Sequence, residues 1–150
     1  MNLIQKIKRI EQYVLENFEE LDLDDPMEEG YWGEYQEIPG ASQKEIEAFE
    51  KKFSIKFPKD FKELYSYKNG SKYFSILPST IHDVEMSFSL MSLEQMEKTK
   101  QYFQNRDALL TEFPDFFTEE EIEKMRDSRI KPYLFHKQWI PFAEYCDSCF

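Results

Sequence analysis

Residues 40–70 contain the start and stop signals of two consecutive helices, and this stretch constrains the fold more than any other. Ser42 and Glu45 have the spacing of a capping box, in which each side chain bonds a free amide of the first helical turn. Pro58 suits the first position of a second helix, where its missing N–H costs nothing. Asn69-Gly70 supplies a left-handed stop. The stretch therefore predicts a helix, a short connection and a second helix.

Each of these two helices has an apolar face. In the first helix, Ile46, Phe49 and Phe53 recur at helical spacing. The predicted buried face of the second helix consists of Phe61, Leu64 and Tyr65. None of these residues belongs to a catalytic pattern, so the stretch specifies structure and not chemistry.

The rest of the chain contains further helix signals. Apolar residues at helical intervals predict an amphipathic helix over residues 3–18, followed by an acidic connection over residues 19–39. Ser92 with Gln95 opens another capped helix that runs to about Asn105. Thr118 with Glu121 opens a short charged helix that ends near Asp127.

Strands are predicted mainly in the second half. Residues 73–77 and 81–90 each have a strand pattern, and Val84, Met86, Phe88 and Leu90 alternate with polar neighbours. Such alternation predicts that one face of the sheet is exposed to solvent, and it favours an antiparallel sheet. Residues 133–150 predict further strands, interrupted around Pro141. Because helices cluster early and strands later, the predicted fold class is α+β.

Several of these motifs resemble the SUKH superfamily. The similarity lies in the Gly-x-Ser-x-x-Glu-Ile opening at Gly40, in Phe-Pro-x-Asp-Phe at residues 57–61 and in Asn69-Gly70. It continues more weakly through residues 90–96 and through Trp-Ile-Pro-Phe-Ala at residues 139–143. The superfamily includes yeast cell-wall-assembly regulators and many bacterial immunity proteins. The similar motifs span about residues 38–143, and a chain of 150 residues fits one domain, residues 1–150. The resemblance implies an α+β domain with N-terminal helices packed on a mainly antiparallel sheet. It further implies a scaffold that binds other proteins, in bacteria usually a toxin, and it assigns no catalytic residue.

The charge of the chain is concentrated in one segment. The formal net charge is −11, yet no Lys or Arg occurs between Ile10 and Gln43. The remaining acids equal the 19 Lys and Arg in number, so the whole excess comes from this segment. Its acids are Glu11, Glu16, Glu19, Glu20, Asp22, Asp24, Asp25, Glu28, Glu29, Glu34 and Glu37.

The acidic segment also contains aromatic and aliphatic residues, which predict that it docks on the domain and is not a disordered tail. Acids interleaved with Tyr and Trp suit a basic partner, and Tyr31, Trp32 and Tyr35 are the expected energetic anchors. The predicted partner-binding residues are Glu19, Glu20, Asp22, Asp24, Asp25, Glu28, Glu29, Tyr31, Trp32, Glu34, Tyr35 and Glu37.

The expected partner is a cognate toxin, most simply a nuclease, because nucleases are basic where they hold phosphates. One alternative is that the acidic surface only keeps the protein soluble. Another is a regulatory or scaffolding domain that has no toxin partner. Binding of nucleic acid is not predicted, since outside the acidic segment the bases are interleaved with acids.

No cofactor, metal site or enzymatic activity is predicted. An EF-hand loop counted from Asp22 would need Gly where Met27 stands. Cys146 and Cys149 form a lone Cys-x-x-Cys without two further ligands at zinc-site spacing, because His82 and His136 are isolated. Among 30 acids, any chosen pair of carboxylates is uninformative.

A cytoplasmic location is predicted from two features. No apolar run approaches the roughly 20 residues of a membrane span. The first residues mix Lys6, Lys8 and Arg9 into the amphipathic helix pattern, which differs from that of a signal peptide.

Overall fold

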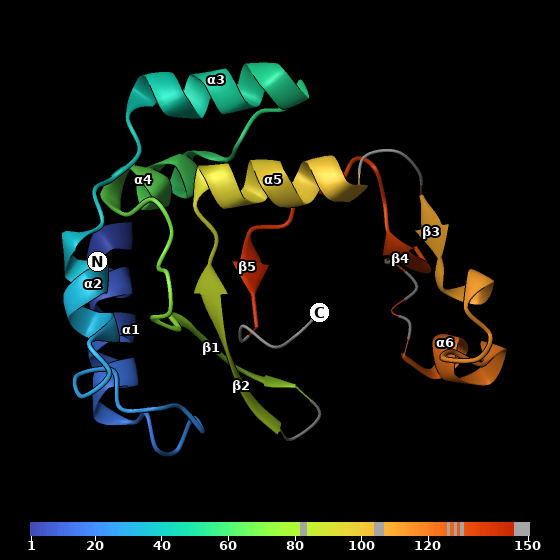
Figure 1. Cartoon of the computed structure of the whole chain (residues 1–150), viewed down its shortest axis with the longest axis horizontal. Helices are drawn as coiled ribbons and strands as arrows, with labels where there is room; N and C mark the ends of the chain where they lie inside the picture. Colours follow the sequence, from blue (N-terminus) through green and yellow to red (C-terminus); the bar gives the residue numbers. More distant parts are fainter. Residues whose placement is uncertain (82–83, 104–106, 126, 128, 130, 146–150) are drawn as a thin grey trace. The chain divides into compact units, whose positions relative to one another are not determined.

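The computed structural model describes residues 1–81, 84–103, 107–125, 127, 129 and 131–145. The chain divides into two compact units, one of residues 1–96 together with the segment from Phe142 onward, and one of residues 97–141. Helices and small antiparallel sheets make up the structure, which confirms the predicted α+β class (Figure 1). The single-domain organisation stays a prediction.

The first unit begins with four helices: α1 (Leu3–Glu16), α2 (Tyr31–Glu37), α3 (Gln43–Phe53) and α4 (Lys59–Tyr67). The predicted capping box of α3 is present, because Ser42 N–H donates to Glu45 Oε2 at 2.7 Å and Ser42 Oγ accepts from Glu45 N–H at 3.3 Å. The first predicted helix is also confirmed, although it ends at Glu16. Helix α2 was not predicted, and it lies inside the expected acidic connection.

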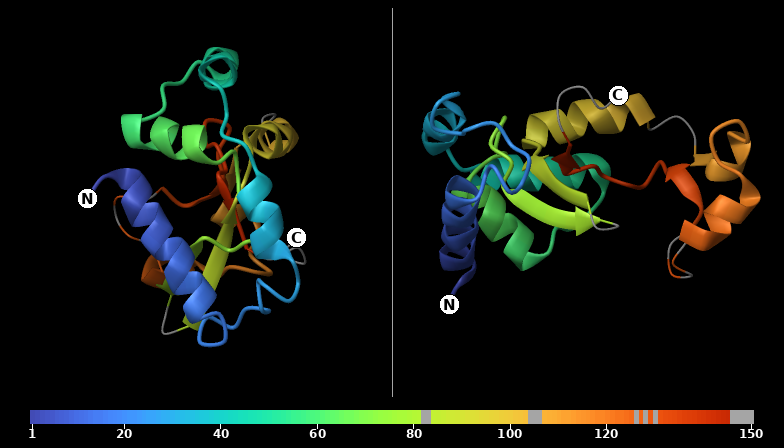
Figure 2. Two further views of the ribbon diagram at one scale, coloured as in Figure 1. Left: turned by 90° about the vertical axis from the view of Figure 1, so that its left-hand side faces the viewer. Right: turned by 90° about the horizontal axis from the view of Figure 1, so that it is seen from below.

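Helices α3 and α4 are joined by a ladder of aromatic rings. Phe49 stacks on Phe57 with 5.4 Å between ring centroids, Phe57 on Phe61 at 4.5 Å, and Phe61 on Tyr65 at 4.6 Å. Pro58 precedes the first helical residue, one position earlier than predicted, because its ψ of 153° is extended. Figure 1 and the left view of Figure 2 both show α3 at the top, with α4 below it.

The Asn69-Gly70 pair has a different role from the predicted helix stop. Helix α4 ends at Tyr67, and the residue that follows it is extended. Gly70 adopts the left-handed φ of +90° two residues further on, where a Cβ would press against the backbone of Ser92. Asn69 Oδ1 accepts the N–H of Leu93 at 2.9 Å. The pair therefore connects α4 to the start of the next helix.

The sheet of the first unit has the order β1-β2-β5, formed by β1 (Leu77–Ile81), β2 (Val84–Leu90) and β5 (Ala143–Glu144). Both pairings are antiparallel, as predicted, with Leu77 opposite Phe88 and Leu90 opposite Ala143. The prediction that one face of the sheet is exposed to solvent was wrong, because Ser87 and Ser89 on the polar face of β2 are buried.

The strand predicted over residues 73–77 was wrong as well, apart from its last residue. The chain turns there, with Phe74 N–H donating to Ser71 O at 3.0 Å. Phe74 and Ile76 are buried while Tyr73 is exposed, so the alternation that mimics a strand comes from an irregular segment that packs on the core. That core contains Ile7, Val14, Leu21, Tyr35, Phe74, Ile76 and Leu90.

Helix α5 (Leu93–Phe103) begins in the first unit and continues into the second. The second unit also contains β3 (Ala108–Leu109), a 3-10 turn (Leu110–Glu112), α6 (Glu119–Met125) and β4 (Tyr133–Phe135). The short strand β3 was not predicted, and it pairs antiparallel with β4. Capping boxes at Ser92 and at Thr118 confirm the two predicted helix starts. His82, Cys146 and Cys149 lie outside the described residues.

Gly40 lies where the chain passes very close to helix α4. The N–H of Ala41 donates to Tyr65 O at 2.8 Å, and the N–H of Asn69 donates to Pro39 O at 3.0 Å. A Cβ on Gly40 would overlap the backbone carbonyl of Ser66. The position therefore requires glycine for its lack of a side chain.

Gly40→Ala is expected to lower the free energy of unfolding by roughly 1–3 kcal/mol, because a backbone carbonyl cannot move aside as a flexible side chain can. The matched control is Gly33→Ala in α2, where a Cβ meets nothing within 4 Å. This control should raise stability by roughly 0.5–1 kcal/mol. Urea unfolding of both variants measures the difference, and equal stabilities would contradict the close approach.

Candidate protein-binding site

The acidic segment is ordered from its first residues. After α1 ends, Leu21 N–H donates to Asn17 O at 3.1 Å and Leu23 N–H donates to Phe18 O at 2.9 Å. Asp22 takes a left-handed φ of 55° within this turn. Leu21 is buried in the core and Leu23 packs against it, so apolar contacts fix the turn to the body of the unit.

A second turn leads into helix α2. Asp25 Oδ1 accepts the N–H groups of Met27 at 2.8 Å and of Glu28 at 3.3 Å. Trp32 N–H then donates to Pro26 O at 2.9 Å. Asp25 is only partly exposed because its carboxylate accepts hydrogen bonds from backbone amides of its own loop.

Helix α2 is attached to α1 and α4 through a buried carboxylate. Glu11 is 6% exposed, and its Oε1 accepts the hydroxyl of Tyr35 at 2.7 Å and that of Tyr67 at 3.1 Å. Burial and the bond to Glu11 raise the pKa of Tyr35 far above its ordinary value. Burial, followed by the charge of Glu11, raises the pKa of Tyr67 to about 12. Both phenols therefore stay protonated and act as donors at neutral pH.

Lys68 supplies a positive charge at the end of α2. Its Nζ donates to the carbonyls of Gln36 at 2.6 Å and Ile38 at 2.9 Å, and lies 5.2 Å from the ring centroid of Tyr35. Burial lowers the pKa of Lys68. A cation at a helix C-terminus satisfies its free carbonyls and offsets the negative end of the helix dipole. The residue that follows α4 thus provides a base that the acidic segment lacks.

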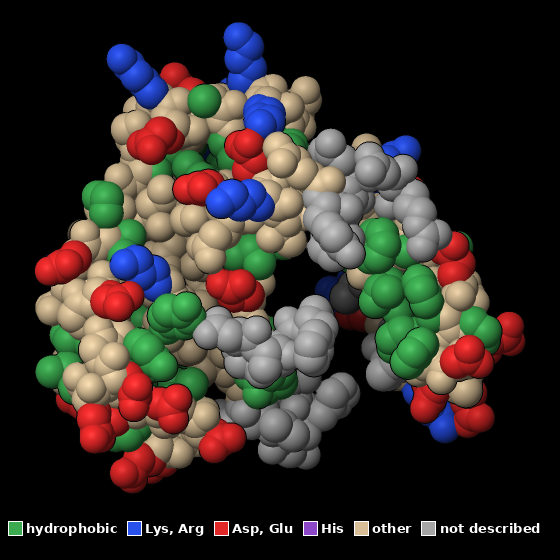
Figure 3. All heavy atoms as spheres, viewed as in Figure 1, with side chains coloured by type: hydrophobic (Ala, Val, Ile, Leu, Met, Phe, Trp, Pro, Cys, Tyr) green, Lys and Arg blue, Asp and Glu red, His purple; other side chains and the backbone are tan. Residues whose placement is uncertain are grey.

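The predicted partner-binding residues divide into three groups by burial. The structure places most of the acids on the surface, and Figure 3 shows Asp and Glu side chains gathered over the connection between α1 and α2. Asp25, Tyr31 and Trp32 are half-buried. Tyr35 is 1% exposed, so its prediction as a contact residue was wrong, because its ring packs on Phe74 and its hydroxyl binds Glu11. The exposed acids are Glu19, Glu20, Asp22, Asp24, Glu28, Glu29, Glu34 and Glu37.

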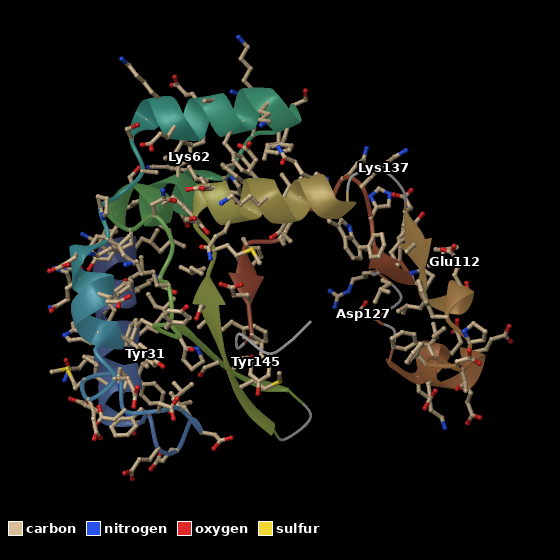
Figure 4. The ribbon with its side chains drawn as sticks, viewed as in Figure 1. Tyr31, Lys62, Glu112, Asp127, Lys137 and Tyr145 are labelled. Carbon is tan, nitrogen blue, oxygen red and sulfur yellow. The ribbon has the colours of Figure 1, made fainter. Side chains whose placement is uncertain are left out.

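Part of this surface is hollowed into a pocket of about 230 Å³. Asp22, Asp24 and Tyr31 line it from the acidic segment, and Lys72, Tyr73 and Glu144 line it from elsewhere in the first unit. The rings of Tyr31 and Tyr73 lie 5.6 Å apart, centroid to centroid. Lys72 Nζ lies 3.5 Å from Glu34 Oε2. Tyr31, the first residue of α2, is labelled in Figure 4.

Sequence reasoning missed the members of this pocket that come from distant parts of the chain. Tyr73 is 54% exposed beside a left-handed Lys72, but its pattern indicated a strand. Glu144 belongs to β5, which pairs with the end of β2. Nothing in the local sequence links Glu144 to residues 22–31, because only the folded sheet brings them together.

The lining gives the pocket a clear chemical preference. Asp22, Asp24 and Glu144 are acidic, and Lys72 is the one base among the described lining residues. Carboxylates beside tyrosine rings suit a guanidinium or ammonium group, which pairs with the first and lies on the face of the second. No group of residues that could hold a metal ion is found in the described part of the chain.

Comparison with known families finds a match to the SMI1 / KNR4 family (SUKH-1) over residues 40–150. The chain belongs to this family. Comparisons with curated proteins and with solved structures give no match. The SUKH family is known for immunity proteins, and the SMI1 / KNR4 name also refers to cell-wall regulators. Among the described residues, no helix is long and apolar enough to cross a membrane.

The SUKH-1 match begins at Gly40, after the last acid of the acidic segment, Glu37. Of the pocket lining, Lys72, Tyr73 and Glu144 fall inside the matched range, whereas Asp22, Asp24 and Tyr31 precede it. The pocket is therefore built from the SUKH-1 region and from a segment that the family match does not cover.

Tyr35→Phe should destabilise the protein by roughly 1.5–3 kcal/mol, because the buried Glu11 carboxylate loses one of its two phenol donors. The control is Tyr13→Phe on the same helix as Glu11, where the side chain is 47% exposed and stability should change by less than about 0.5 kcal/mol. Thermal unfolding compares the two variants. Equal stabilities would show that the hydroxyl of Tyr35 does not hold α2 in place.

Proposed function

We propose that the protein is an immunity protein that binds a cognate bacterial toxin, most simply a nuclease, and occludes its basic active-site cleft. Membership of the SUKH-1 family supports a protein-binding role. The toxin and its activity are the specific part of the proposal. The proposal also places the protein in the cytoplasm, where a nuclease toxin would act.

The observation that carries the proposal is the acid-lined pocket flanked by Tyr31 and Tyr73. A nuclease holds phosphates with Lys and Arg side chains. An arginine of that kind could enter between Asp22 and Glu144 and lie against the exposed ring of Tyr73. Interfaces concentrate their binding energy in Tyr, Trp and Arg, so Tyr73 and Tyr31 are the expected anchors here in place of Tyr35.

The surrounding acids act mainly on the rate of association. Exposed ion pairs contribute only about 0–1 kcal/mol each, so the rim carboxylates add little affinity one by one. Complementary fields, by contrast, raise association rate constants from ~10⁵–10⁶ to ~10⁸–10⁹ M⁻¹s⁻¹ at low salt. Fast capture suits an antitoxin, because even a small number of free toxin molecules is enough to cause damage.

The direct test is co-expression of this chain with the toxin encoded beside its gene. We expect survival of the host cell with the unmodified chain and death with an empty vector. The control is a chain that lacks the pocket anchors, Tyr31→Ala with Tyr73→Ala, assayed at matched expression and folding. Survival no better than with the empty vector would reject the immunity function.

The contribution of charge is tested by neutralising Asp22, Asp24, Glu28 and Glu29 as Asn or Gln. Association with the toxin should slow about tenfold or more at low salt and lose most of its salt dependence, while the fold is kept. The matched control neutralises four exposed acids of the second unit: Asp115, Glu119, Glu120 and Glu123. Stopped-flow association at several salt concentrations measures both sets. Identical rates for the two sets would show that the acidic segment only adds solubility.

The second candidate is a regulatory or scaffolding domain that recruits a cellular protein without any toxin. The SMI1 / KNR4 name, which also refers to cell-wall regulators, favours this candidate. The same pocket would then receive a basic segment of a host protein. Gene neighbourhood separates the two candidates, because an immunity gene is expected beside a toxin gene.

A further inference from the structure

The second unit contains a pocket with the opposite chemical character. It has a volume of about 370 Å³ and is lined by Arg129, Lys131, Tyr133, His136, Gln138 and Trp139. This volume falls within the ~300–1,000 Å³ of small-molecule sites. All of the described residues that line it lie between residues 97 and 141, and none of them lines the acid-lined pocket.

Three aromatic rings form one wall of this basic pocket. After β4 the chain makes a tight turn, in which Trp139 N–H donates to His136 O at 2.9 Å. The turn brings the indole of Trp139 against Tyr133, with 6.2 Å between centroids and 83° between planes. Tyr133 in turn contacts His136 at 4.7 Å. Trp139 stays 45% exposed, which leaves a flat surface open to a ligand.

The imidazole in this wall is fixed by a hydrogen bond at Nδ1. His136 Nδ1 accepts the N–H of Gln138 at 3.1 Å, so its proton lies on Nε2 in the neutral ring. Nε2 faces Asp107 Oδ2 at 3.6 Å, and Asp107 Oδ1 accepts the N–H of Lys137 at 2.8 Å. The aromatic wall is therefore preorganised by hydrogen bonds and does not have to be ordered by a ligand.

Positive charge lies beside the rings. The guanidinium of Arg129 binds the Asp127 carboxylate through Nε at 2.9 Å and Nη2 at 2.6 Å, which leaves three of its five N–H groups for other acceptors. Tyr133 N–H donates to Lys131 O at 2.8 Å in a tight turn at Pro132, and both residues line the pocket. Figure 4 labels Asp127 and Lys137, both in this unit.

The local sequence has an excess of bases within a chain of negative net charge. Residues 126–139 contain four bases and one acid, although the whole chain has a net charge of −11. Such a local excess beside an exposed indole is the combination that accommodates an anion attached to a flat ring.

We propose that this pocket binds a mononucleotide, with the base stacked on Trp139 and the phosphate near Arg129 and Lys131. An acidic peptide would use the bases but has no need of the ring wall. A nucleic acid strand would need a basic stripe that follows its backbone beyond one pocket. The mononucleotide uses both features within one pocket.

The test is titration of the full chain with AMP, followed by calorimetry and by tryptophan fluorescence. Adenosine and inorganic phosphate are the partial ligands, and AMP should bind more tightly than either. Trp139→Leu should weaken AMP binding about tenfold or more, because base stacking is lost. Lys131→Gln, at an exposed position, should weaken it several-fold without disturbing the fold.

Matched controls come from the same unit but lie outside the pocket. Phe116→Leu removes an aromatic ring that is 78% exposed, and Lys124→Gln removes a base that is 72% exposed. Both should leave AMP binding unchanged. The proposal is overturned if roughly 1 mM AMP produces neither a binding heat in calorimetry nor quenching of the tryptophan fluorescence. It is also overturned by equal effects of Lys131→Gln and Lys124→Gln, or by preferred binding of oligo-dT or of a Glu-rich peptide.

Discussion

The buried carboxylate of Glu11 is the constraint on which the arrangement of the first unit depends. An ionised carboxylate is costly to bury unless hydrogen bonds replace its water, and the hydroxyls of Tyr35 and Tyr67 do so here. These donors come from α2 and α4, so satisfying one charge on α1 joins three helices. Lys68 strengthens the junction by binding the last carbonyls of α2. The acidic surface keeps its shape because one of the eleven acids of the segment is buried below it.

Local features of the fold could be predicted from the sequence, because their physical cause is local. A capping box needs two residues three positions apart, and those at Ser42 and Thr118 are both present. The strand predicted at residues 73–77 fails because a period of two also fits an irregular chain that buries Phe74 and Ile76. Helix α2 was missed because it has seven residues, includes Gly33 and has no side-chain cap. Tertiary packing of Tyr35, and not helix propensity, accounts for it.

In the candidate site, too, some features have a local cause in the sequence and others depend on tertiary contacts. Its negative charge follows from composition, because no base lies between Ile10 and Gln43. The residues that complete it depend on contacts distant in sequence: Tyr73 reaches Tyr31 after α4, and Glu144 arrives with β5. Tyr35 was misplaced on the surface because an aromatic residue among acids looks the same in sequence whether its ring is exposed or buried. Contacts between residues that are distant in the sequence decide whether such a ring is exposed or buried, and these contacts cannot be recognised in a single sequence.

The ordered turns between α1 and α2 also affect what binding would cost. Asp25 fixes one turn through two backbone amides, and Leu21 holds the other in the core. The conformational entropy of this loop has therefore already been lost during folding. A flexible acidic tail of equal charge would lose it on association, at the expense of affinity and with a larger heat-capacity change. A ligand that meets this loop finds it preformed, so more of the free energy of each new contact remains as binding strength.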